Sequence, residues 1–168
     1  MTSPAASPET LPLEAQAGAR LQARGLTLSV AESSTGGLIA ERLTDISGSS
    51  AYMIGGVMAY ADSVKAQLLG VRDELLRAHG AVSAPVAQQM AEGIRTLLKT
   101  DLAISTTGIT GPTGGTATKP VGLHFIGLSA AEGAWVRRYV FAGDRRSVRH
   151  AAADAALQLL LDYLDGKL

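Results

Sequence analysis

A serine, a tyrosine and a lysine form the first group of residues that could do chemistry. Ser50 ends the run Gly48-Ser49-Ser50, and Tyr60 and Lys65 follow it. A serine hydroxyl is a weak nucleophile until a base takes its proton, and a lysine becomes that base only when burial or a nearby cation lowers its pKa. Tyr60 and Lys65 could face one pocket. Alternatively, Tyr60 packs in the fold and Lys65 lies on a solvated helix face, as most lysines do.

The histidines show no pattern that would supply a different base or a metal site. His79, His124 and His150 stand far apart in the sequence without an evident partner, which favours surface or packing positions for each. The chain has no His-x-x-x-His pair, no cysteine and no acidic cluster of the calcium-loop type. We therefore expect neither a metal site nor a cofactor.

The segment Glu32-Ser33-Ser34-Thr35-Gly36-Gly37 follows one predicted strand and opens a predicted helix. The hydroxyls of Ser33 and Thr35 and the amides of Gly36 and Gly37 could bind an anion at a helix N-terminus. The same residue types also cap helices, so the spacing equally fits a structural cap with glycines for close packing.

A second polar segment runs over residues 106–116 and holds four glycines and five threonines in eleven positions. Such a loop exposes backbone amides and hydroxyls, so Thr107 and Gly108 could lie close to a ligand. No Gly-Lys-Ser/Thr follows at the spacing of a phosphate-binding loop, and no Gly-x-Gly-x-x-Gly occurs. The alternative is a flexible connection between two strands.

Five arginines gather near the C-terminal third of the chain. They are Arg137, Arg138, Arg145, Arg146 and Arg149. Arg145 follows Gly143-Asp144 at a predicted strand-to-helix junction, where its guanidinium could hold a phosphate. A nucleic-acid stripe is the rival function, but zero net charge and 4% aromatic residues make nucleic acid an unlikely partner. Ordinary helix-surface charge is the third alternative.

Hydrophobic periodicity predicts the elements that must position these residues. Helices are expected over residues 13–24, from about 35, around 64–69, over 72–79, 85–98 and 145–164. Strands are expected over residues 26–31, 55–60, 102–107, 121–128 and 135–141. Strands alternate with helices at first and then two strands occur in succession, which predicts an α/β fold, a three-layer α/β/α sandwich with a mixed sheet.

This architecture predicts where the function lies. In open α/β sheets, ligands bind beyond the C-terminal ends of the strands, which here means the segments after Ala31, Tyr60 and Thr107. Pro4 and Pro8 stand among small polar residues, so we expect residues 1–12 to form a disordered tail and residues 13–168 to form one domain.

Composition narrows the class of protein. The chain has 168 residues, of which 46% are hydrophobic and 18% charged, enough to bury a core. It has no cysteine, which excludes a disulfide scaffold and a thiol nucleophile. The N-terminus lacks the features of a signal peptide and no apolar run is long enough to span a membrane, so a cytoplasmic location is expected.

Taken in order, several short segments resemble the CinA C-terminal domain family over about residues 13–164. The matching segments are 31–37, 48–50, 55–57 with Tyr60 and Lys65, 69–71, 79–83, 107–116, 119–122 and 141–145. Stand-alone members of this family are nicotinamide mononucleotide deamidases. The resemblance implies an α/β/α sandwich, a homodimer, and a metal-independent serine amidohydrolase that converts nicotinamide mononucleotide and water to nicotinic acid mononucleotide and ammonia.

The resemblance also implies roles for individual residues. Ser50 would be the nucleophile, Lys65 its base, and Tyr60 an orienting or proton-relaying hydroxyl. The substrate-binding residues would be Ser33, Thr35, Gly36, Gly37, Thr107, Gly108 and Arg145.

Two other functions stay open. The family commonly has asparagine and glutamate where this chain has Asp62 and Ser63. A carboxylate near Lys65 favours the charged ammonium, which would suit a nucleotide-binding module with weak turnover. The arginine group and the competence-related family name suggest a DNA-associated role.

Overall fold

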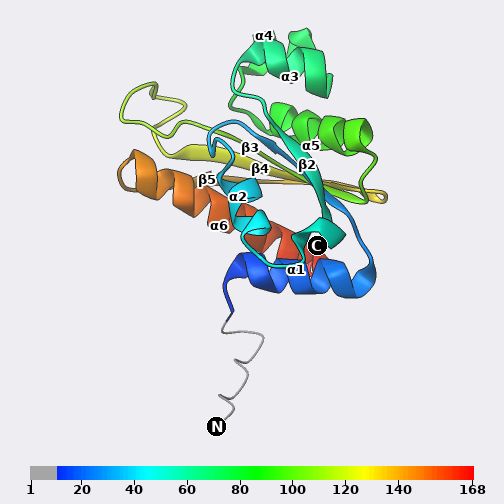
Figure 1. Ribbon diagram of the computed structural model, residues 1–168. Coiled ribbons are helices and arrows are strands. Elements are labelled where there is room, and N and C mark those ends of the chain that lie inside the picture. Colours follow the sequence, from blue (N-terminus) through cyan, green and yellow to red (C-terminus); the bar gives the residue numbers. More distant parts are fainter. Residues whose placement is uncertain (1–10) are drawn as a thin grey trace.

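The computed structural model describes residues 11–168, so the predicted tail lies outside the described residues except for its last two positions. The described residues form five strands and six α-helices (Figure 1). The elements are α1 (Leu13–Arg24), β1 (Leu28–Glu32), α2 (Leu38–Thr44), the 3-10 turn η2 (Ser49–Ala51), β2 (Met53–Met58), α3 (Asp62–Leu69), α4 (Asp73–His79), α5 (Ala84–Leu98), β3 (Leu102–Gly108), β4 (Leu123–Ala130), β5 (Gly133–Val140) and α6 (Arg145–Leu164).

The strands form one mixed sheet with the order β2-β1-β3-β4-β5. β1 is parallel to both of its neighbours, whereas β4 is antiparallel to β3 and to β5. The predicted α/β fold with a mixed sheet is confirmed. β1 and β3 are buried along nearly their whole length, which is why they read in the sequence as continuous runs rather than as alternating patterns.

Helices cover both faces of the sheet (Figure 1). On one face α1, α2 and α6 pack against the strands through a buried cluster that includes Leu21, Ile39 and Leu160. On the other face α3, α4 and α5 enclose a smaller cluster around Leu69 and Met90. The three layers are therefore held together by two separate hydrophobic interfaces.

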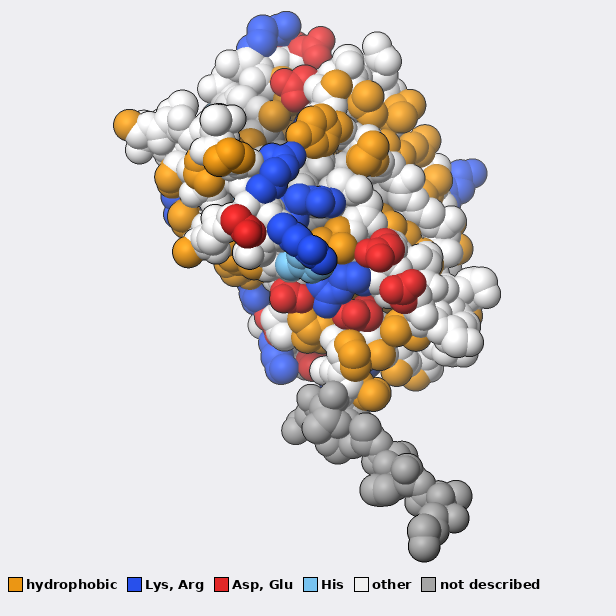
Figure 2. Space-filling model, turned by 60° about the vertical axis from the view of Figure 1, so that its left-hand side comes forward, with side chains coloured by type: hydrophobic (Ala, Val, Ile, Leu, Met, Phe, Trp, Pro, Cys, Tyr) orange, Lys and Arg blue, Asp and Glu red, His pale blue; other side chains and the backbone are white. Residues whose placement is uncertain are grey.

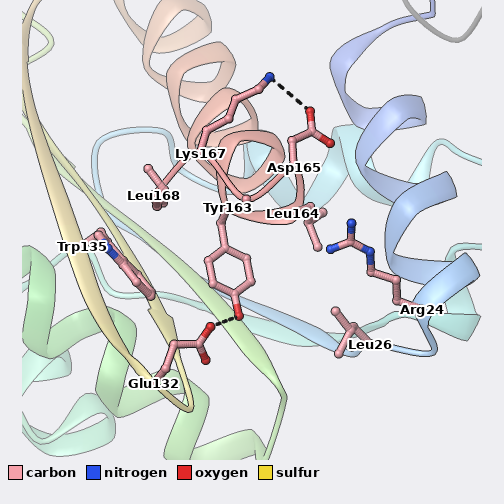
Figure 3. Close-up of a pocket in the computed structure, with 10 residues that line it drawn as sticks. Arg24, Leu26, Glu132, Trp135, Tyr163, Leu164, Asp165, Lys167 and Leu168 are labelled. Carbon is pink, nitrogen blue, oxygen red and sulfur yellow. Dashed lines mark hydrogen bonds and ion pairs between the residues drawn. The ribbon is translucent and has the colours of Figure 1, made fainter.

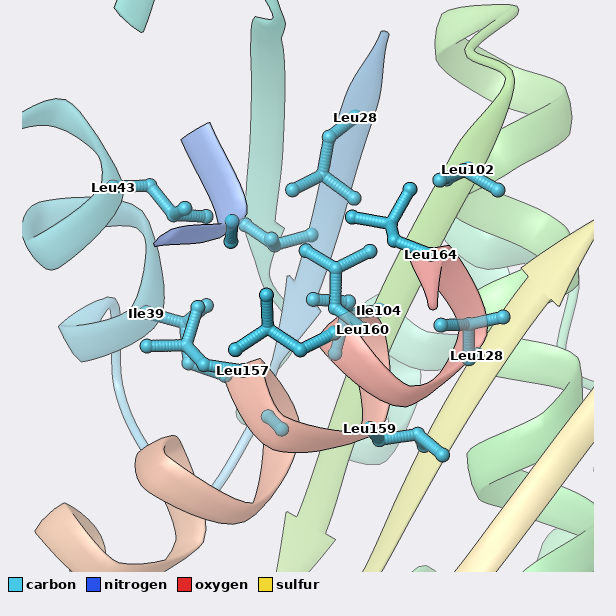
Figure 4. Close-up of a cluster of buried hydrophobic side chains, with 14 of the residues drawn as sticks. Leu28, Ile39, Leu43, Leu102, Ile104, Leu128, Leu157, Leu159, Leu160 and Leu164 are labelled. Atoms are coloured by element: carbon cyan, nitrogen blue, oxygen red, sulfur yellow. The ribbon is translucent and has the colours of Figure 1, made fainter. Parts of the chain in front are cut away.

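The larger interface is built mainly by the leucines of α6. Figure 4 shows Leu157 and Leu160 of this helix between Ile39 of α2 and the strand residue Ile104. All four side chains are essentially inaccessible to solvent. Truncating one such leucine to alanine typically costs about 2–5 kcal/mol of stability. The sheet is thus a rigid support for the loops at its edges.

The bounds of β2 differ from the prediction in a way that matters for the site. The sequence predicted a strand over residues 55–60, whereas β2 covers Met53–Met58. The chain leaves the sheet after Met58 because it must turn into α3, which begins at Asp62. Tyr60 therefore lies in the connecting turn, beyond the strand.

None of the helices within residues 11–168 combines the length and the apolar character needed to cross a membrane.

Candidate functional site

The three parallel strands, β1, β2 and β3, have their C-terminal ends side by side at one end of the sheet. Glu32, the last residue of β1, pairs with Met58 of β2 and with Thr106 of β3. The chain segments that follow these strands therefore start side by side, about 4.8 Å apart from strand to strand. They carry Ser33, Tyr60, Lys65 and the threonine- and glycine-rich loop.

Lys65 has the most unusual environment of these residues. Its side chain is only 1% exposed although it lies on α3, close to the surface. The Nζ atom donates to the carbonyl oxygen of Tyr60 at 2.9 Å and lies 3.4 Å from Oδ1 of Asp62. Burial lowers the pKa of the Lys65 ammonium, and the nearby Asp62 carboxylate partly opposes that shift. A solvated helix face is therefore not the position of this lysine.

Ser33 leaves β1 next to this lysine-bearing turn. Its backbone N–H donates to the carbonyl oxygen of Thr106, and the preceding Glu32 accepts a hydrogen bond from the N–H of Ala59, the residue before Tyr60. Ser33 is thus held between the ends of β2 and β3. Its neighbour Ser34 has a buried Oγ with no hydrogen-bond partner within residues 11–168.

Ser50 lies at the other end of β2. It belongs to η2, ahead of Met53, and is exposed, whereas Tyr60 and Lys65 follow Met58. A six-residue strand is about 20 Å long, so the two groups stand at opposite edges of the sheet. Within one chain Ser50 therefore does not approach Lys65. The sequence separation of the two residues is short, but the strand between them is fully extended.

The Glu32 carboxylate occupies the segment, residues 32–37, that the sequence offered as an anion site. Its carboxylate accepts hydrogen bonds from the Thr35 hydroxyl at 2.6 Å and from the N–H groups of Gly37, Ile39 and Ala40 at 2.9–3.1 Å. The start of α2 is therefore occupied by an internal carboxylate, which satisfies the free amides of the helix end. This geometry supports a structural cap at the start of α2 rather than a site for an external anion.

Thr35, Gly36 and Gly37 accordingly serve the protein's own structure. The Thr35 hydroxyl is buried and also lies 2.7 Å from the Thr106 hydroxyl. Both glycines have positive φ angles, 63° and 98°, which turn the chain from β1 into α2. The carbonyl of Thr35 accepts a hydrogen bond from Arg149 of α6 at 2.6 Å.

Thr107 and Gly108 likewise have structural neighbours. The Thr107 hydroxyl donates to the carbonyl oxygen of Ala81 at 2.8 Å, tying β3 to the turn before α5. A Cβ atom on Gly108 would lie 2.2 Å from the ring of His124. His124 is itself buried, and burial lowers its pKa. The glycine is therefore required by close packing inside the sheet.

Arg145 joins two parts of the predicted site. It is the first residue of α6, where Asp144 caps the helix by accepting from the N–H of Ser147 at 2.8 Å. One guanidinium nitrogen donates to the Thr110 hydroxyl at 2.7 Å and to the Gly111 carbonyl at 2.8 Å. The other lies 3.5 Å from the hydroxyl of Tyr60. Arg145 and Tyr60 therefore lie close together beyond the C-terminal ends of the strands.

Thr110 and Gly111 are residues of this site that the sequence did not single out. Both belong to the threonine- and glycine-rich loop, and both are buried beneath Arg145. The clustering of threonine and glycine signalled the loop as a whole. It could not indicate which positions contact an arginine that lies more than thirty residues further along the chain.

One face of the molecule is mixed in charge. Figure 2 shows a row of Lys and Arg side chains near a histidine, with Asp and Glu on both sides of the row. Arg145, Arg146 and His150 are exposed in the first turns of α6. An extended nucleic-acid surface would carry basic residues without interleaved acids, and this face does not have that pattern.

A hollow lies at the opposite end of the parallel strands, beside the start of β1 and the β4–β5 turn (Figure 3). Its volume is about 860 Å³, and its walls include Trp135, Tyr163 and Glu132. The Tyr163 hydroxyl donates to Glu132 at 2.5 Å. Burial, together with that hydrogen bond, raises the pKa of Tyr163 to about 12. Its hydroxyl therefore stays protonated, and the hollow offers no nucleophile with a base beside it.

Within residues 11–168 no three histidine, aspartate or glutamate side chains come together in a way that could hold a metal ion.

The fold and the site define a class: a three-layer α/β protein whose polar site lies beyond parallel strand ends and includes a buried lysine. The CinA C-terminal domain family model matches residues 10–164, and the chain belongs to this family. It is 53% identical over 153 residues to a CinA-like protein of Syntrophus aciditrophicus, covering 90% of this chain and 36% of that protein. It is 49% identical over 148 residues to a putative competence-damage inducible protein of Moorella thermoacetica, covering 88% of this chain and 36% of that protein.

A solved structure with a related name is also similar to this chain. The competence/damage inducible protein CihA from Agrobacterium tumefaciens is 37% identical, with a TM-score of 0.88, and the match covers 98% of this chain and 99% of that one. The chain spans only about a third of the length of the curated relatives named above.

Proposed function

We propose that this chain is an amidohydrolase that converts nicotinamide mononucleotide and water to nicotinic acid mononucleotide and ammonia. The observation that carries the proposal is Lys65, a buried lysine with a lowered pKa at the strand edge from which Ser33 emerges. Membership of the CinA C-terminal domain family supports the substrate class through the resemblance described above. A cytoplasmic location is part of this proposal.

Ser33 replaces Ser50 as the proposed nucleophile within one chain. Neutral Lys65 takes the proton of the Ser33 hydroxyl as its oxygen attacks the amide carbon. The C–N bond then breaks, the proton passes from Lys65 to the leaving nitrogen, and ammonia departs. A nicotinoyl ester on Ser33 remains. Water, deprotonated by Lys65, hydrolyses this ester and regenerates the serine, so one water is consumed for each ammonia released.

Arg145 and Tyr60 would hold the substrate. A guanidinium is well suited to a phosphate, because it offers parallel donors and a permanent charge. One side of the Arg145 guanidinium is held by Thr110 and Gly111, so the group is preorganised. Tyr60 is 62% exposed beside it, and its ring and hydroxyl could orient the ribose or the pyridine ring.

A second candidate function is a nucleotide-binding module with weak turnover. The 3.4 Å contact between Lys65 and Asp62 favours it, because this carboxylate stabilises the ammonium that cannot act as a base. The two functions differ in one measurable respect. A binding module would bind nicotinamide mononucleotide without releasing ammonia.

Ammonia release from nicotinamide mononucleotide by the purified protein, with chromatographic identification of nicotinic acid mononucleotide, tests the proposal. Turnover is expected, and it should survive prolonged EDTA treatment, because a serine and a lysine supply the nucleophile and the base. Binding by calorimetry without turnover would establish the binding module instead. Activity that EDTA abolishes and added zinc or magnesium restores would contradict the mechanism.

A further inference from the structure

The hollow beside the start of β1 has the size and the lining of a small-molecule site. Its volume of about 860 Å³ lies within the usual range for such sites. Its walls come from three separate parts of the chain: the end of α1 with Leu26, the β4–β5 turn with the start of β5, and the end of α6. Aromatic, aliphatic and charged side chains all line it, a mixture that can hold a ring and fix its orientation.

Trp135 and Tyr163 form the aromatic wall of the hollow. Their ring centroids are 5.4 Å apart with an interplanar angle of 53°, a tilted contact in which each ring helps to hold the other in place. Both rings also pack, together with Leu26, against the larger buried cluster. The Tyr163 hydroxyl is held as well, because it donates to Glu132. The apolar surface that a bound ring would cover is therefore formed before any ligand arrives.

The charged side chains around the hollow leave one cation without a partner. Asp165 is held by two cations, Arg20 at 2.8 Å and Lys167 at 3.3 Å. Arg24 takes part in none of the ion pairs within residues 11–168, and Figure 3 shows its side chain in the wall of the hollow. Three cations therefore stand against the carboxylates of Glu132 and Asp165. This excess favours an anionic group on the ligand, which a planar guanidinium can bind through two parallel N–H donors.

We propose that this hollow binds a planar aromatic anion, with its ring on Trp135 and Tyr163 and its anionic group on Arg24. Aromatic carboxylates and mononucleotides share this chemistry, since each joins a flat ring to a group that carries negative charge. The ring covers the apolar wall, and the anion takes up the free donors of the guanidinium. The site binds its ligand and contributes no nucleophile to a reaction.

This site is separate from the candidate active site, and it stands independently of the proposed function. Tyr60, Lys65 and Arg145 lie beyond the C-terminal ends of the strands, whereas the hollow is lined by Leu26, which precedes β1. The five residues of β1 alone span about 17 Å. A ligand in the hollow therefore does not touch Lys65 or Arg145, and different variants test the two sites.

The fluorescence of Trp135 reports on the hollow directly, because the chain has only one tryptophan. Benzoate and adenosine monophosphate are the probes for the two sources of an aromatic anion. At least one of them should change the fluorescence saturably, with a Kd below about 1 mM. Its neutral counterpart, benzamide or adenosine, should bind at least about tenfold more weakly, because a charge-assisted contact is lost.

The pattern of saturation identifies the ligand class. Saturation by benzoate alone assigns the hollow to aromatic carboxylates, and saturation by adenosine monophosphate alone assigns it to mononucleotides. Acetate and inorganic phosphate lack a ring and should bind at least about tenfold more weakly than the matching aromatic probe. The proposal is overturned if neither probe saturates, or if the neutral or ringless compounds bind as tightly as the aromatic anions.

Arg24→Gln tests the anionic contact, and Arg72→Gln is its matched control. Both arginines are exposed, and Arg72 directly precedes α4 on the other face of the sheet. Arg24→Gln should weaken the charged probe by about tenfold and leave its neutral counterpart unchanged. Arg72→Gln and Arg145→Gln should leave the binding of both unchanged. A probe whose binding is lost in Arg145→Gln and kept in Arg24→Gln occupies the candidate active site instead, which overturns the proposal.

Glu132→Gln tests the sign of the ligand's charge. Glu132 is exposed, so the change should leave the fold intact, and the amide oxygen can still accept from the Tyr163 hydroxyl. Loss of this carboxylate should tighten the binding of the charged probe by roughly two- to fivefold, the size of an interaction between exposed charges. Weaker binding of the anion by this variant, or tighter binding of benzylamine than of benzoate by the wild-type chain, would show that the hollow takes cations and would overturn the proposal.

Discussion

Lys65, the proposed base, lies buried beside Asp62. Burial favours the neutral amine, whereas the carboxylate 3.4 Å away favours the ammonium. The pKa of Lys65 is lowered overall, so burial outweighs the carboxylate. A base must be neutral to accept a proton, and turnover should therefore rise with pH as Lys65 loses its proton.

Asp62→Asn removes the group that opposes this loss. The side chain of Asp62 is exposed, so the change should leave the fold intact. Without the carboxylate the pKa of Lys65 falls further, and the rising limb of the pH–rate profile should move to lower pH. The profile of ammonia release against pH measures this directly. A limb that moves to higher pH would show that Lys65 is not the base.

Arg145→Ala tests the phosphate contact. An arginine–phosphate interaction is charge-assisted, and losing it should cost on the order of 1.5–3 kcal/mol of substrate binding. The loss should appear mainly in KM for nicotinamide mononucleotide and should be smaller for nicotinamide riboside, which lacks the phosphate. Equal losses on both substrates would assign Arg145 to the ring, the amide or the fold instead.

At the scale of the element, the sequence predicted the strands and helices well because their signals are local. Continuous apolar runs marked β1 and β3, and Gly25 marked the end of α1, where it adopts a left-handed conformation. The exact bounds of β2 are harder to predict, and a shift of two residues decides on which side of the strand end Tyr60 lies.

The function of the Glu32–Gly37 segment was equally ambiguous from sequence. Hydroxyls and glycines at a helix start suit an external anion and a structural cap alike. The decision depends on Glu32, whose carboxylate turns back onto the amides of α2. The contact between this carboxylate and the amides of α2 forms only in the folded protein. The residue spacing in the sequence does not distinguish it from a carboxylate that points to solvent.

Gly93→Ala tests whether the packing of α3 on α5 positions Lys65. A Cβ atom on Gly93 would lie 1.9 Å from the carbonyl oxygen of Leu69, the last residue of α3. Alanine favours a helix interior by roughly 0.5–1 kcal/mol, but the clash should cost about 1–3 kcal/mol. We expect a lower free energy of unfolding and reduced turnover.

Gly133→Ala is the control for that variant. A Cβ atom there would have only the ring of Trp135 within 4.0 Å, so stability and turnover should be close to wild type. A Gly93→Ala protein as stable and active as Gly133→Ala would show that the contact between α3 and α5 is adaptable.

At the scale of the whole molecule, the buried histidine couples stability to pH. The pKa of His124 is lowered by burial, so in the folded protein its ring stays neutral below the usual value. In the unfolded chain the ring titrates near pH 6.5. Unfolding therefore takes up a proton at lower pH. Stability contributed by neutral His124 is present above about pH 6.5 and is lost as pH falls toward the folded pKa.

Thermal unfolding between pH 8 and pH 5 measures this effect. The free energy of unfolding should fall by at most about 1.4 kcal/mol per pH unit from this one group. His124→Asn should flatten the dependence in this window, and an unchanged slope would assign it to other groups.

We propose that the C-terminal ends of β1, β2 and β3 carry a serine amidohydrolase site with Ser33 as its nucleophile. Ammonia release from nicotinamide mononucleotide by Ser33→Ala tests it most directly, with Ser47→Ala, an exposed serine in the loop before η2, as the comparison. We predict at least about a thousandfold loss of turnover for Ser33→Ala with an unchanged circular dichroism spectrum, and near wild-type turnover for Ser47→Ala. A folded Ser33→Ala protein with more than about a tenth of wild-type turnover would contradict the account, because losing a covalent nucleophile costs far more than tenfold.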